Sequence, residues 1–137
     1  MSSSASDILA QHSLRKTLIR TQVLEVFLQA HEALSHNDIE SRFDQLDRIT
    51  LYRTLRTFEE KGIIHKAIDG GDKLKYALCS GHCSEHAHED RHAHFNCEAC
   101  GKTFCIESMN APVVQAPAGY RLSGTYLVLK GTCATCA

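Results

Sequence analysis

Two cysteine pairs, far apart in the sequence, place the strongest constraint on how this chain can fold. Cys97 and Cys100 lie in the segment HAHFNCEACGKTFC, and Cys133 and Cys136 lie in the last five residues. Four thiolates arranged as two Cys-x-x-Cys pairs are typical ligands of a tetrahedral Zn²⁺ ion. The 32 residues between the pairs exceed the usual spacing of a zinc ribbon, so we expect a folded sheet to bring them together. Since four thiolates leave no open coordination position, this zinc is predicted to be structural.

Size and composition exclude several classes of protein. The 137 residues suit one medium domain or two small ones, and a small domain gains from a metal that holds its modest core together. The charges nearly cancel, with 15 Lys and Arg against 16 Asp and Glu, so any basic surface must be local. No signal peptide or membrane-spanning apolar run is visible, which predicts a cytoplasmic protein. In a reducing cytosol, the seven cysteines are better explained as metal ligands and thiols than as disulfides.

The first 80 residues are predicted to form a winged helix-turn-helix domain. After a short helix near residues 7–11, apolar side chains recur at helical spacing in TLIRTQVLEVFLQA. The sequence SHND, which starts at Ser35, has the form of a capping box for a short helix. The segment RITLYRTLRTFEEKG then places Leu51, Leu55 and Phe58 on one face, with Gly62 as a C-cap. Two β-prone runs, IIHKAI and KLKYAL, flank a Gly-Gly turn and complete the pattern as a hairpin.

The order of these elements favours DNA binding, although an amphipathic helix most often only covers a core. In a winged helix-turn-helix, the recognition helix enters the major groove and the wing contacts the backbone. Arginines there pair with phosphate or guanine, and Thr or Tyr contacts phosphates or thymine methyls. The residues predicted to contact double-stranded DNA are Lys16, Arg20, Thr50, Tyr52, Arg53 and Arg56.

The rest of the chain is predicted to form a hinge, residues 81–91, and a small metal-binding domain, residues 92–137. The hinge is polar and rich in His, Cys and acidic residues. Two strands are predicted on either side of the cysteine knuckle, HAHFNC and KTFCIE. In the second of them, Cys105 lies on the face opposite Phe104 and Ile106. Residues 120–130 are predicted to form a last long strand. Pro112 and Pro117 argue against a long helix around them. The predicted fold class is α+β, a winged helix-turn-helix followed by a small antiparallel sheet with structural zinc.

A second metal site is predicted near His92 and His94. The two histidines are two residues apart on a strand, so both imidazoles are expected to project from one face and share an ion. The ligand-rich segment before them strengthens this prediction, although several of its histidines also suit a solvated loop. Further candidate ligands are His65, Cys79, Cys83, Glu85, His86, His88 and Cys105.

Three stretches of the chain resemble the ferric uptake regulator superfamily of metal-dependent bacterial repressors. DRITLYRTLRTFEEKGII is similar to the family's recognition helix, HAHFNCEACGKTFC to its His-x-His-x-x-Cys-x-x-Cys-Gly segment, and LVLKGTCATC to its C-terminal end. The resemblance covers nearly the whole chain. It implies a C-terminal dimerisation domain and a homodimer that represses transcription by binding palindromic operators when a regulatory metal is present. It implies no enzymatic step, no small organic substrate and no membrane partner.

The resemblance is greatest to zinc uptake regulators, in which the regulatory ion would bind His65, Cys79, His92 and His94. The family's iron and peroxide sensors would instead use the two strand histidines with the positions of Ala33, Glu85 or His86, and Cys105. Cysteine at a position where those sensors have a carboxylate favours zinc over Fe²⁺ or Mn²⁺. We therefore expect two Zn²⁺ ions per chain, one structural and one regulatory, with Fe²⁺ or Mn²⁺ as the alternative at the regulatory site. Alternative ligands of that site are Cys83, Glu85, His86 and Cys105.

The chain departs from the family's pattern in two places. A further histidine-rich site would need ligands at Arg91, Ala93 and Thr125, so no third site is expected there. The prolines imply that the usual dimerisation helix is shortened or missing, so the dimer is expected to rest mainly on sheet pairing.

A zinc hydrolase is the alternative from another class of protein. Glu85 or Glu89 is formally available as its general base. The sequence lacks any H-x-E arrangement, and its H-E-x-x-H match, HEDRH at residues 88–92, falls at the end of the polar predicted hinge and not on a helix as that motif requires, which argues against such an enzyme.

Overall fold

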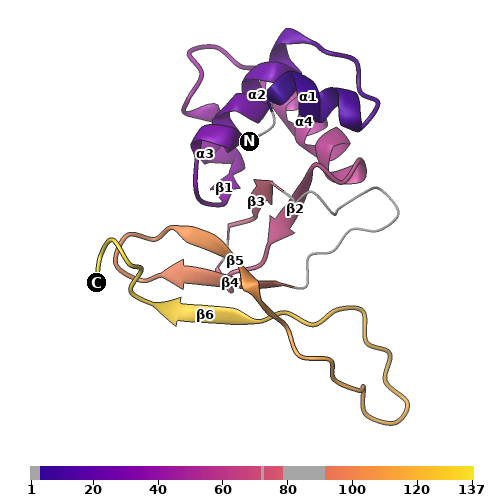
Figure 1. The fold of residues 1–137 in the computed structure, drawn as a ribbon, viewed down its shortest axis with the longest axis vertical. Coiled ribbons are helices and arrows are strands. Elements are labelled where there is room, and N and C mark those ends of the chain that lie inside the picture. Colours follow the sequence, from indigo (N-terminus) through magenta and orange to yellow (C-terminus); the bar gives the residue numbers. More distant parts are fainter. Residues whose placement is uncertain (1–3, 72, 79–91) are drawn as a thin grey trace.

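The computed structural model describes residues 4–71, 73–78 and 92–137 of the chain. The elements form two groups, helices with a small first sheet and a second sheet that carries the cysteine pairs (Figure 1). The helices are α1 (Ala5–Gln11), α2 (Leu18–Gln29), α3 (His36–Glu40) and α4 (Arg48–Glu60). The strands are β1 (Leu34–Ser35), β2 (Ile64–Ala67), β3 (Lys75–Leu78), β4 (His92–Cys97), β5 (Thr103–Asn110) and β6 (Val128–Gly131).

The short helix α3 and the recognition-type helix α4 begin and end at residues that suit helix termini. The Ser35 hydroxyl accepts from the Asp38 N–H while the Asp38 carboxylate accepts from the Ser35 N–H, which confirms the predicted capping box. Beyond α4, Gly62 has a φ of 80° in the left-handed region that favours glycine. The Ile63 N–H then donates to the Phe58 carbonyl at 2.8 Å, the pattern of a Schellman C-cap.

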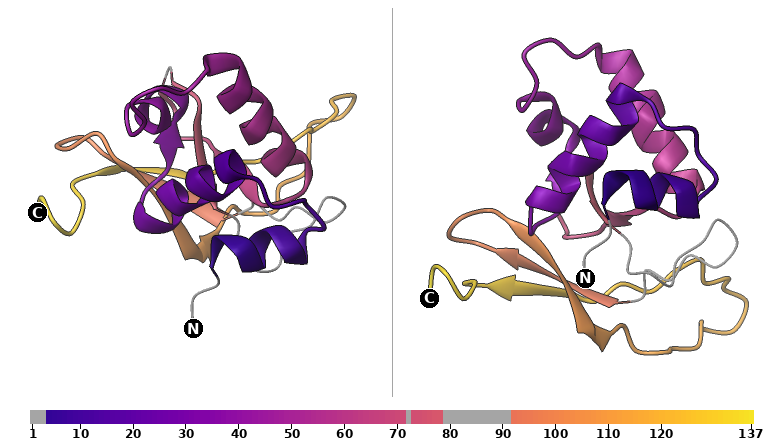
Figure 2. Two further views of the ribbon diagram at one scale, coloured as in Figure 1. Left: turned by 90° about the horizontal axis from the view of Figure 1, so that it is seen from above. Right: turned by 45° about the horizontal axis from the view of Figure 1, so that its top comes forward.

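The helices enclose an apolar core in the first group of elements. Leu51, Leu55 and Phe58 on α4 are buried, as their spacing predicted, and they pack with apolar residues of α1, α2 and β2. Burial of each such side chain stabilises the fold by about 1.5–3 kcal/mol. Figure 2 shows α1, α2 and α4 gathered on one side of the molecule, away from the second sheet. None of the described helices is long and apolar enough to cross a membrane.

The first sheet has the strand order β1-β3-β2. Its β2–β3 pair is the predicted hairpin, with Ile64 opposite Leu78 and Ala67 opposite Lys75. The two-residue strand β1 adds a third, antiparallel strand that the sequence pattern did not predict. Two residues are too few to show any alternation, so only the folded chain reveals this strand.

The second sheet has the order β5-β4-β6 and is mixed, whereas the sequence predicted an antiparallel sheet. β4 and β5 are antiparallel as expected, but β6 pairs with β4 in parallel. The reason is that β5 stops at the end of the sheet where β4 starts, and β6 starts at that same end. β6 therefore runs in the direction of β4, and it pairs with the edge of β4 that β5 does not occupy. The last strand is also shorter than the predicted strand of residues 120–130, because the ladder includes only Val128–Gly131. The fold class remains α+β.

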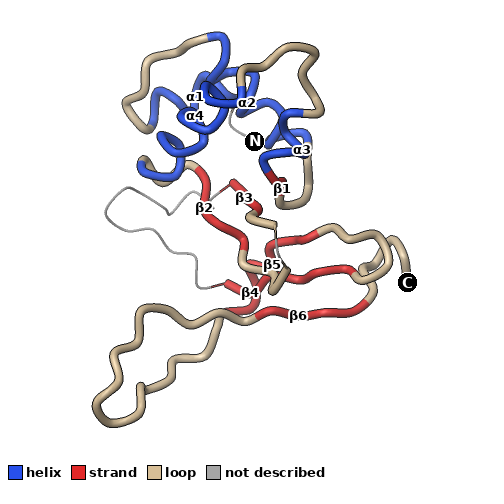
Figure 3. The backbone as a smooth tube through the Cα atoms, turned by 180° about the vertical axis from the view of Figure 1, so that it is seen from behind, coloured by secondary structure: helices blue, strands red, loops and turns tan. Residues whose placement is uncertain are grey.

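Residues 111–127, which we call the arm, contain no helix or strand (Figure 3). The arm leaves the end of β5, projects away from the second sheet and returns to β6. Pro112 and Pro117 lie in it, and the absence of a helix there agrees with their effect on helix formation. The opposite side of the second sheet faces β2 and β3, which lie between it and the helices (Figure 1). This stacking places first-sheet side chains next to those of β4 and β5.

Candidate metal centres and DNA-facing helix

The four predicted cysteine ligands meet at one end of the second sheet. β4 ends at Cys97, and the knuckle after it turns at Gly101, whose φ of 77° lies in the left-handed region. Because β6 runs beside β4 with Gly131 opposite Cys97, the chain end emerges next to the knuckle. The sulfur atoms of Cys97, Cys100, Cys133 and Cys136 all lie within 4.8 Å of one another. The mixed sheet therefore closes the 32-residue gap between the two pairs.

Backbone amides stabilise negative charge within this cysteine cluster. The N–H groups of Cys100 and Cys133 donate to the Cys97 sulfur at 3.4 and 3.3 Å. These hydrogen bonds lower the pKa of the Cys97 thiol to about 6, so it is mostly thiolate at neutral pH. Hydrogen bonding with the sulfurs of Cys133 and Cys100 raises the pKa of Cys136 to about 12. The four sulfurs thus become thiolates together only beside a cation, which is the chemistry of a metal site.

The sulfur spacing fits zinc. With Zn–S bonds of about 2.3 Å, tetrahedral geometry places ligand sulfurs about 3.8 Å apart. The sulfurs of Cys100 and Cys133 are 3.9 Å apart. Four sulfur ligands leave no position for a substrate or water, so the cluster suits a structural ion.

A second group of candidate ligands lies between the two sheets. It consists of His65 on β2, His94 on β4 and Cys105 on β5. The Nε2 atom of His65 is 3.5 Å from Nε2 of His94 and 3.5 Å from the sulfur of Cys105. Both histidines are only 1% exposed, and Cys105 is half-buried. Three strands from two separate sheets therefore contribute to one buried cluster.

This second cluster also fits a tetrahedral zinc ion. For nitrogen and sulfur ligands, the expected N–N and N–S separations are about 3.3 and 3.5 Å. Both measured separations, 3.5 Å, are close to these values. The described side chains supply three of the four ligands that a tetrahedral site needs. In the part of the chain that the structure describes, this group and the four cysteines are the clusters of three or more such ligands.

Several predicted ligands of the second site lie outside the described residues, namely Cys79, Cys83, Glu85 and His86, as does the His92 side chain. The predicted hinge, residues 81–91, lies outside them as well. These assignments stay predictions. For His92 the backbone is described, and the β4–β5 register shifts between His92 and Ala93. The regular alternation that placed His92 on the same face as His94 is interrupted at that point.

Sequence reasoning gave Cys105 only as an alternative ligand of the regulatory site, whereas the structure places its sulfur beside the two histidines. Cys105 lies directly opposite His94 in the β4–β5 ladder. Strand alternation already put Cys105 on the face opposite Phe104 and Ile106, which was the available signal. The sequence alone does not provide the register that aligns Cys105 with His94.

The ligand position of iron and peroxide sensors near the third helix does not carry a ligand here. Ala33 is buried, and its N–H donates to the Thr103 carbonyl at 2.7 Å. Of the nearby histidines, His31 is exposed and His36 lies 3.6 Å from the Glu40 carboxylate.

The outer face of α4 presents the side chains predicted to contact DNA. Thr50, Tyr52, Arg53 and Arg56 are all exposed, with Tyr52 at 57%. Two of them have local partners. The Thr50 hydroxyl donates to the Asp47 carboxylate at 2.9 Å, so it helps to cap α4. Arg56 pairs with Glu60 at 3.2 Å, an exposed ion pair worth at most about 1 kcal/mol, which phosphate can replace.

Lys16 and Arg20 lie at the start of α2. Lys16 is exposed, and Arg20 is half-buried with its guanidinium donating to the Arg15 carbonyl at 2.9 Å. Both cations therefore flank the N-terminal end of that helix, where backbone N–H groups also favour an anion such as phosphate.

A winged helix-turn-helix joined to a sheet with clustered metal ligands defines a class of protein, the metal-binding DNA-binding regulators. Residues 11–118 match the ferric uptake regulator family. The ferric uptake regulation protein of Shigella flexneri is 30% identical over 135 residues, covering 92% of this chain and 86% of that protein. The chain belongs to the ferric uptake regulator family, whose members are transcriptional regulators and not enzymes. The hydrolase alternative is thereby set aside.

Solved structures share this fold. A zinc uptake regulator complexed with zinc and DNA superposes with a TM-score of 0.63 at 24% identity, covering 96% of this chain and 89% of that one. A zinc-bound manganese uptake regulator gives a TM-score of 0.64 at 18% identity, covering 96% and 99%. The neighbours thus include regulators of zinc and of manganese uptake.

Proposed function

We propose that this chain is a zinc-responsive repressor that binds palindromic operator DNA as a homodimer when its second metal site is filled. The observation that supports this most strongly is the position of His65. This histidine belongs to the wing of the DNA-binding domain, while His94 and Cys105 belong to the second sheet. Their ligand atoms nevertheless lie within 4.8 Å of one another. An ion held by all three joins the two parts of the molecule.

The proposed role of the second site is to fix the orientation of the DNA-binding domain. A bound Zn²⁺ supplies bonds that cross the interface between the sheets. His65 then holds the wing, and with it α4, in one position relative to the second sheet. In a dimer this sets the distance between the two α4 helices, which must match the spacing of roughly 34–36 Å between successive major grooves. Coupling of this kind typically amounts to about 1–3 kcal/mol, or a 5- to 150-fold change in operator affinity.

Zinc is the proposed ion because of the ligand types. Two imidazoles and a thiolate suit Zn²⁺, whereas Fe²⁺ and Mn²⁺ sensors rely on carboxylates at such positions. We propose His65, His94 and Cys105 as three ligands and Cys79 as the fourth. Cys79 directly follows β3, whose Ala77 pairs with His65. His92 remains an alternative for the fourth position, and an iron- or peroxide-responsive regulator remains the alternative function.

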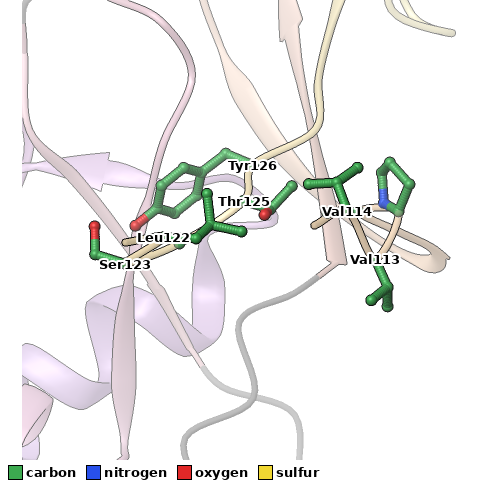
Figure 4. Close-up of a pocket in the computed structure, with 9 residues that line it drawn as sticks. Val113, Val114, Leu122, Ser123, Thr125 and Tyr126 are labelled. Carbon is green, nitrogen blue, oxygen red and sulfur yellow. The ribbon is translucent and has the colours of Figure 1, made fainter. Parts of the chain in front are cut away.

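The proposed homodimer uses the second sheet and the arm. Apolar side chains of the arm are exposed to solvent, and Val113 is the most exposed at 82%. The arm folds back on itself around a cavity of about 420 Å³, with Val113 and Val114 on one limb and Leu122 and Tyr126 on the other (Figure 4). An exposed apolar segment of this kind is typical of a surface that a partner covers. Within the described chain, the edge strand β6 also has an unpaired side, and the edge strand β5 is paired on its outer side only at Thr103, with Ala33.

The proposed function is tested by metal-dependent DNA binding. Operator sequences are first selected from a random pool with the zinc-loaded protein. Binding of the selected duplex is then measured with Zn²⁺, Fe²⁺ and Mn²⁺ at fixed salt, because phosphate contacts make affinity depend on salt. We expect Zn²⁺ to raise affinity at least fivefold over protein that carries only the structural ion. An increase with Fe²⁺ or Mn²⁺ but not Zn²⁺ would support the iron-sensing alternative.

A further inference from the structure

A cluster of polar side chains crosses the same interface as the second metal site but contains none of its ligands. Asp69 follows β2 and Lys75 starts β3, while Thr103 starts β5 in the second sheet. The Thr103 hydroxyl donates to the Asp69 carboxylate at 2.7 Å. The Lys75 ammonium lies 3.3 Å from the same carboxylate and donates to the Thr103 hydroxyl at 3.0 Å. Asp69 and Thr103 are buried, at 5% and 0% exposure.

The Thr103 hydroxyl is the centre of this cluster. A hydroxyl has one hydrogen to donate and two lone pairs that accept. Here the hydrogen goes to Asp69, and the lone pairs accept from Lys75 and from the Asn96 side-chain amide at 3.1 Å. Removal of the hydroxyl therefore leaves buried polar groups on both sheets without this partner.

Two further contacts fix the backbone around Thr103. The Ala33 N–H, in the first group of elements, donates to the Thr103 carbonyl at 2.7 Å. The Lys75 ammonium also donates to the Gly101 carbonyl at 3.1 Å. The start of β5 is thus held against the first sheet by side-chain and backbone bonds together.

The polar cluster and the metal ligands occupy neighbouring positions along the same strands of the two sheets. His65 and Asp69 are four residues apart along β2 and its continuation, with Ala67 between them. On β5, Thr103 and Cys105 are two residues apart, and on β4 Asn96 lies opposite Thr103 as His94 lies opposite Cys105. Each step of two residues along a strand spans about 6.6 Å. The polar cluster is therefore one strand step from the metal ligands on the second sheet.

Small side chains pack at the interface between the two sheets, where the polar cluster forms one end and the metal ligands form the other. Ala33, Ala67 and Ala77 are buried and pack with Cys105. Methyl groups allow the sheets to approach closely but provide little shape that resists sliding. The polar cluster supplies that resistance, because its hydrogen bonds have defined lengths and directions.

We propose that Asp69, Lys75 and Thr103 form an anchor, present without metal, that sets the register of the two sheets and so positions His65 for the second metal ion. This inference rests on the proposed metal site of His65, His94 and Cys105. The anchor residues do not bind metal and act as positioning residues. When the second metal site is empty, the anchor still holds the first sheet against the second sheet near Thr103. When the ion binds, His65 is held against the second sheet as well.

The anchor predicts that Thr103→Val weakens zinc binding at the second site although Thr103 is not a ligand. Valine keeps the branched shape and removes the hydroxyl, while Thr103→Ser retains the hydroxyl as the matched control. Affinity is measured on the full chain with its structural zinc, by competition with a chelator. If only a fraction of the protein holds His65 in place, the apparent affinity falls by that fraction. We expect about a tenfold loss for Thr103→Val, and a near-normal affinity for Thr103→Ser.

A readout without metal at the second site tests the anchor separately. Hydrogen exchange of the Ala33 amide reports the bond to the Thr103 carbonyl. In protein that carries only the structural zinc, we expect faster exchange at Ala33 in Thr103→Val than in the wild type or Thr103→Ser. Lys75→Met, which removes a second member of the cluster, is expected to act in the same direction. Unchanged exchange at Ala33 in both variants would overturn the proposal.

Combining Thr103→Val with His65→Ala separates the anchor from the metal site itself. If the anchor acts through His65, Thr103→Val weakens zinc binding in the wild type but adds little when His65 is already absent. An equal loss in both backgrounds would show general destabilisation and overturn the anchor. Normal zinc affinity in Thr103→Val together with a loss in His65→Ala would also overturn it, while leaving the metal site intact. Normal affinity in His65→Ala would remove the proposed metal site, and the exchange of Ala33 would still decide whether the anchor exists.

Discussion

At the scale of single residues, Cys97 shows how the backbone prepares a metal ligand. Its sulfur accepts N–H groups from both knuckles, one from Cys100 and one from Cys133. The same bonds that lower its pKa also join the end of β4 to the end of the chain. Loss of this sulfur therefore removes a ligand and a contact between distant segments.

Replacing Cys97 with Ala is expected to abolish structural zinc binding and to unfold the second sheet. Structural zinc contributes directly to folding in small domains, and a three-ligand remnant binds much more weakly. Bound zinc per chain and thermal unfolding followed by circular dichroism measure both effects. Cys105→Ser is the matched control, since it should retain the structural ion and the fold. A soluble, folded Cys97→Ala protein with its structural zinc would contradict the assignment.

Asp69 provides a pH dependence that is separate from the metal ligands. Burial opposes its charge, but hydrogen bonds from the Gly71 N–H and the Thr103 hydroxyl, together with Lys75, outweigh burial and hold the pKa of Asp69 below its usual value. A carboxyl group with a lowered pKa in the folded state stabilises that state above its unfolded pKa. This stabilisation is lost as the pH falls through the folded pKa.

The stabilities of the wild type and Asp69→Asn are therefore expected to differ at neutral pH and to converge in acid. Chemical unfolding between pH 3 and pH 7, with pH values chosen around the ordinary pKa of an aspartate side chain, about 4, measures this difference. Asp44→Asn, at an exposed position, is the control and should show no such convergence. A constant difference across the pH range would mean that the Asp69 charge does not contribute.

At the scale of elements, α4 combines a buried face with a face that carries the predicted DNA contacts. Its apolar face was predictable because the helical repeat is local, and the same holds for the capping box and the β2–β3 hairpin. The strand β1 and the parallel pairing of β6 were not predictable. Both depend on partners far away in the sequence, and strand alternation alone does not reveal which partner a strand will take.

Arg53→Ala is expected to weaken operator binding without changing zinc content. An arginine that contacts a base or phosphate typically contributes about 1–3 kcal/mol, or roughly a 5- to 150-fold change in affinity. Binding measured at several salt concentrations distinguishes the two kinds of contact, because loss of a phosphate contact lowers the salt slope by about one. Arg121→Ala, in the arm, is the control for loss of one positive charge. Equal binding by Arg53→Ala and the wild type would remove Arg53 from the interface.

At the scale of the whole molecule, two sheets face each other and contribute side chains to one buried cluster. The sequence indicated that His65 and His94 could share an ion only through resemblance to a family, since 28 residues separate them. Cys105 required the register of β4 against β5, and the anchor around Thr103 required the stacking of the sheets. Short-range patterns thus predicted the elements and the cysteine site, while the interface between domains emerged only from the three-dimensional arrangement.

The central claim is that one zinc ion links the DNA-binding domain to the second sheet through His65. The most direct measurement is the zinc affinity of the second site in His65→Ala, determined by chelator competition with the structural zinc retained. His36→Ala, a histidine of the same domain away from the cluster, is the control. We predict at least a roughly tenfold loss of affinity for His65→Ala and no change for His36→Ala. Equal zinc affinity in His65→Ala and the wild type would contradict the claim.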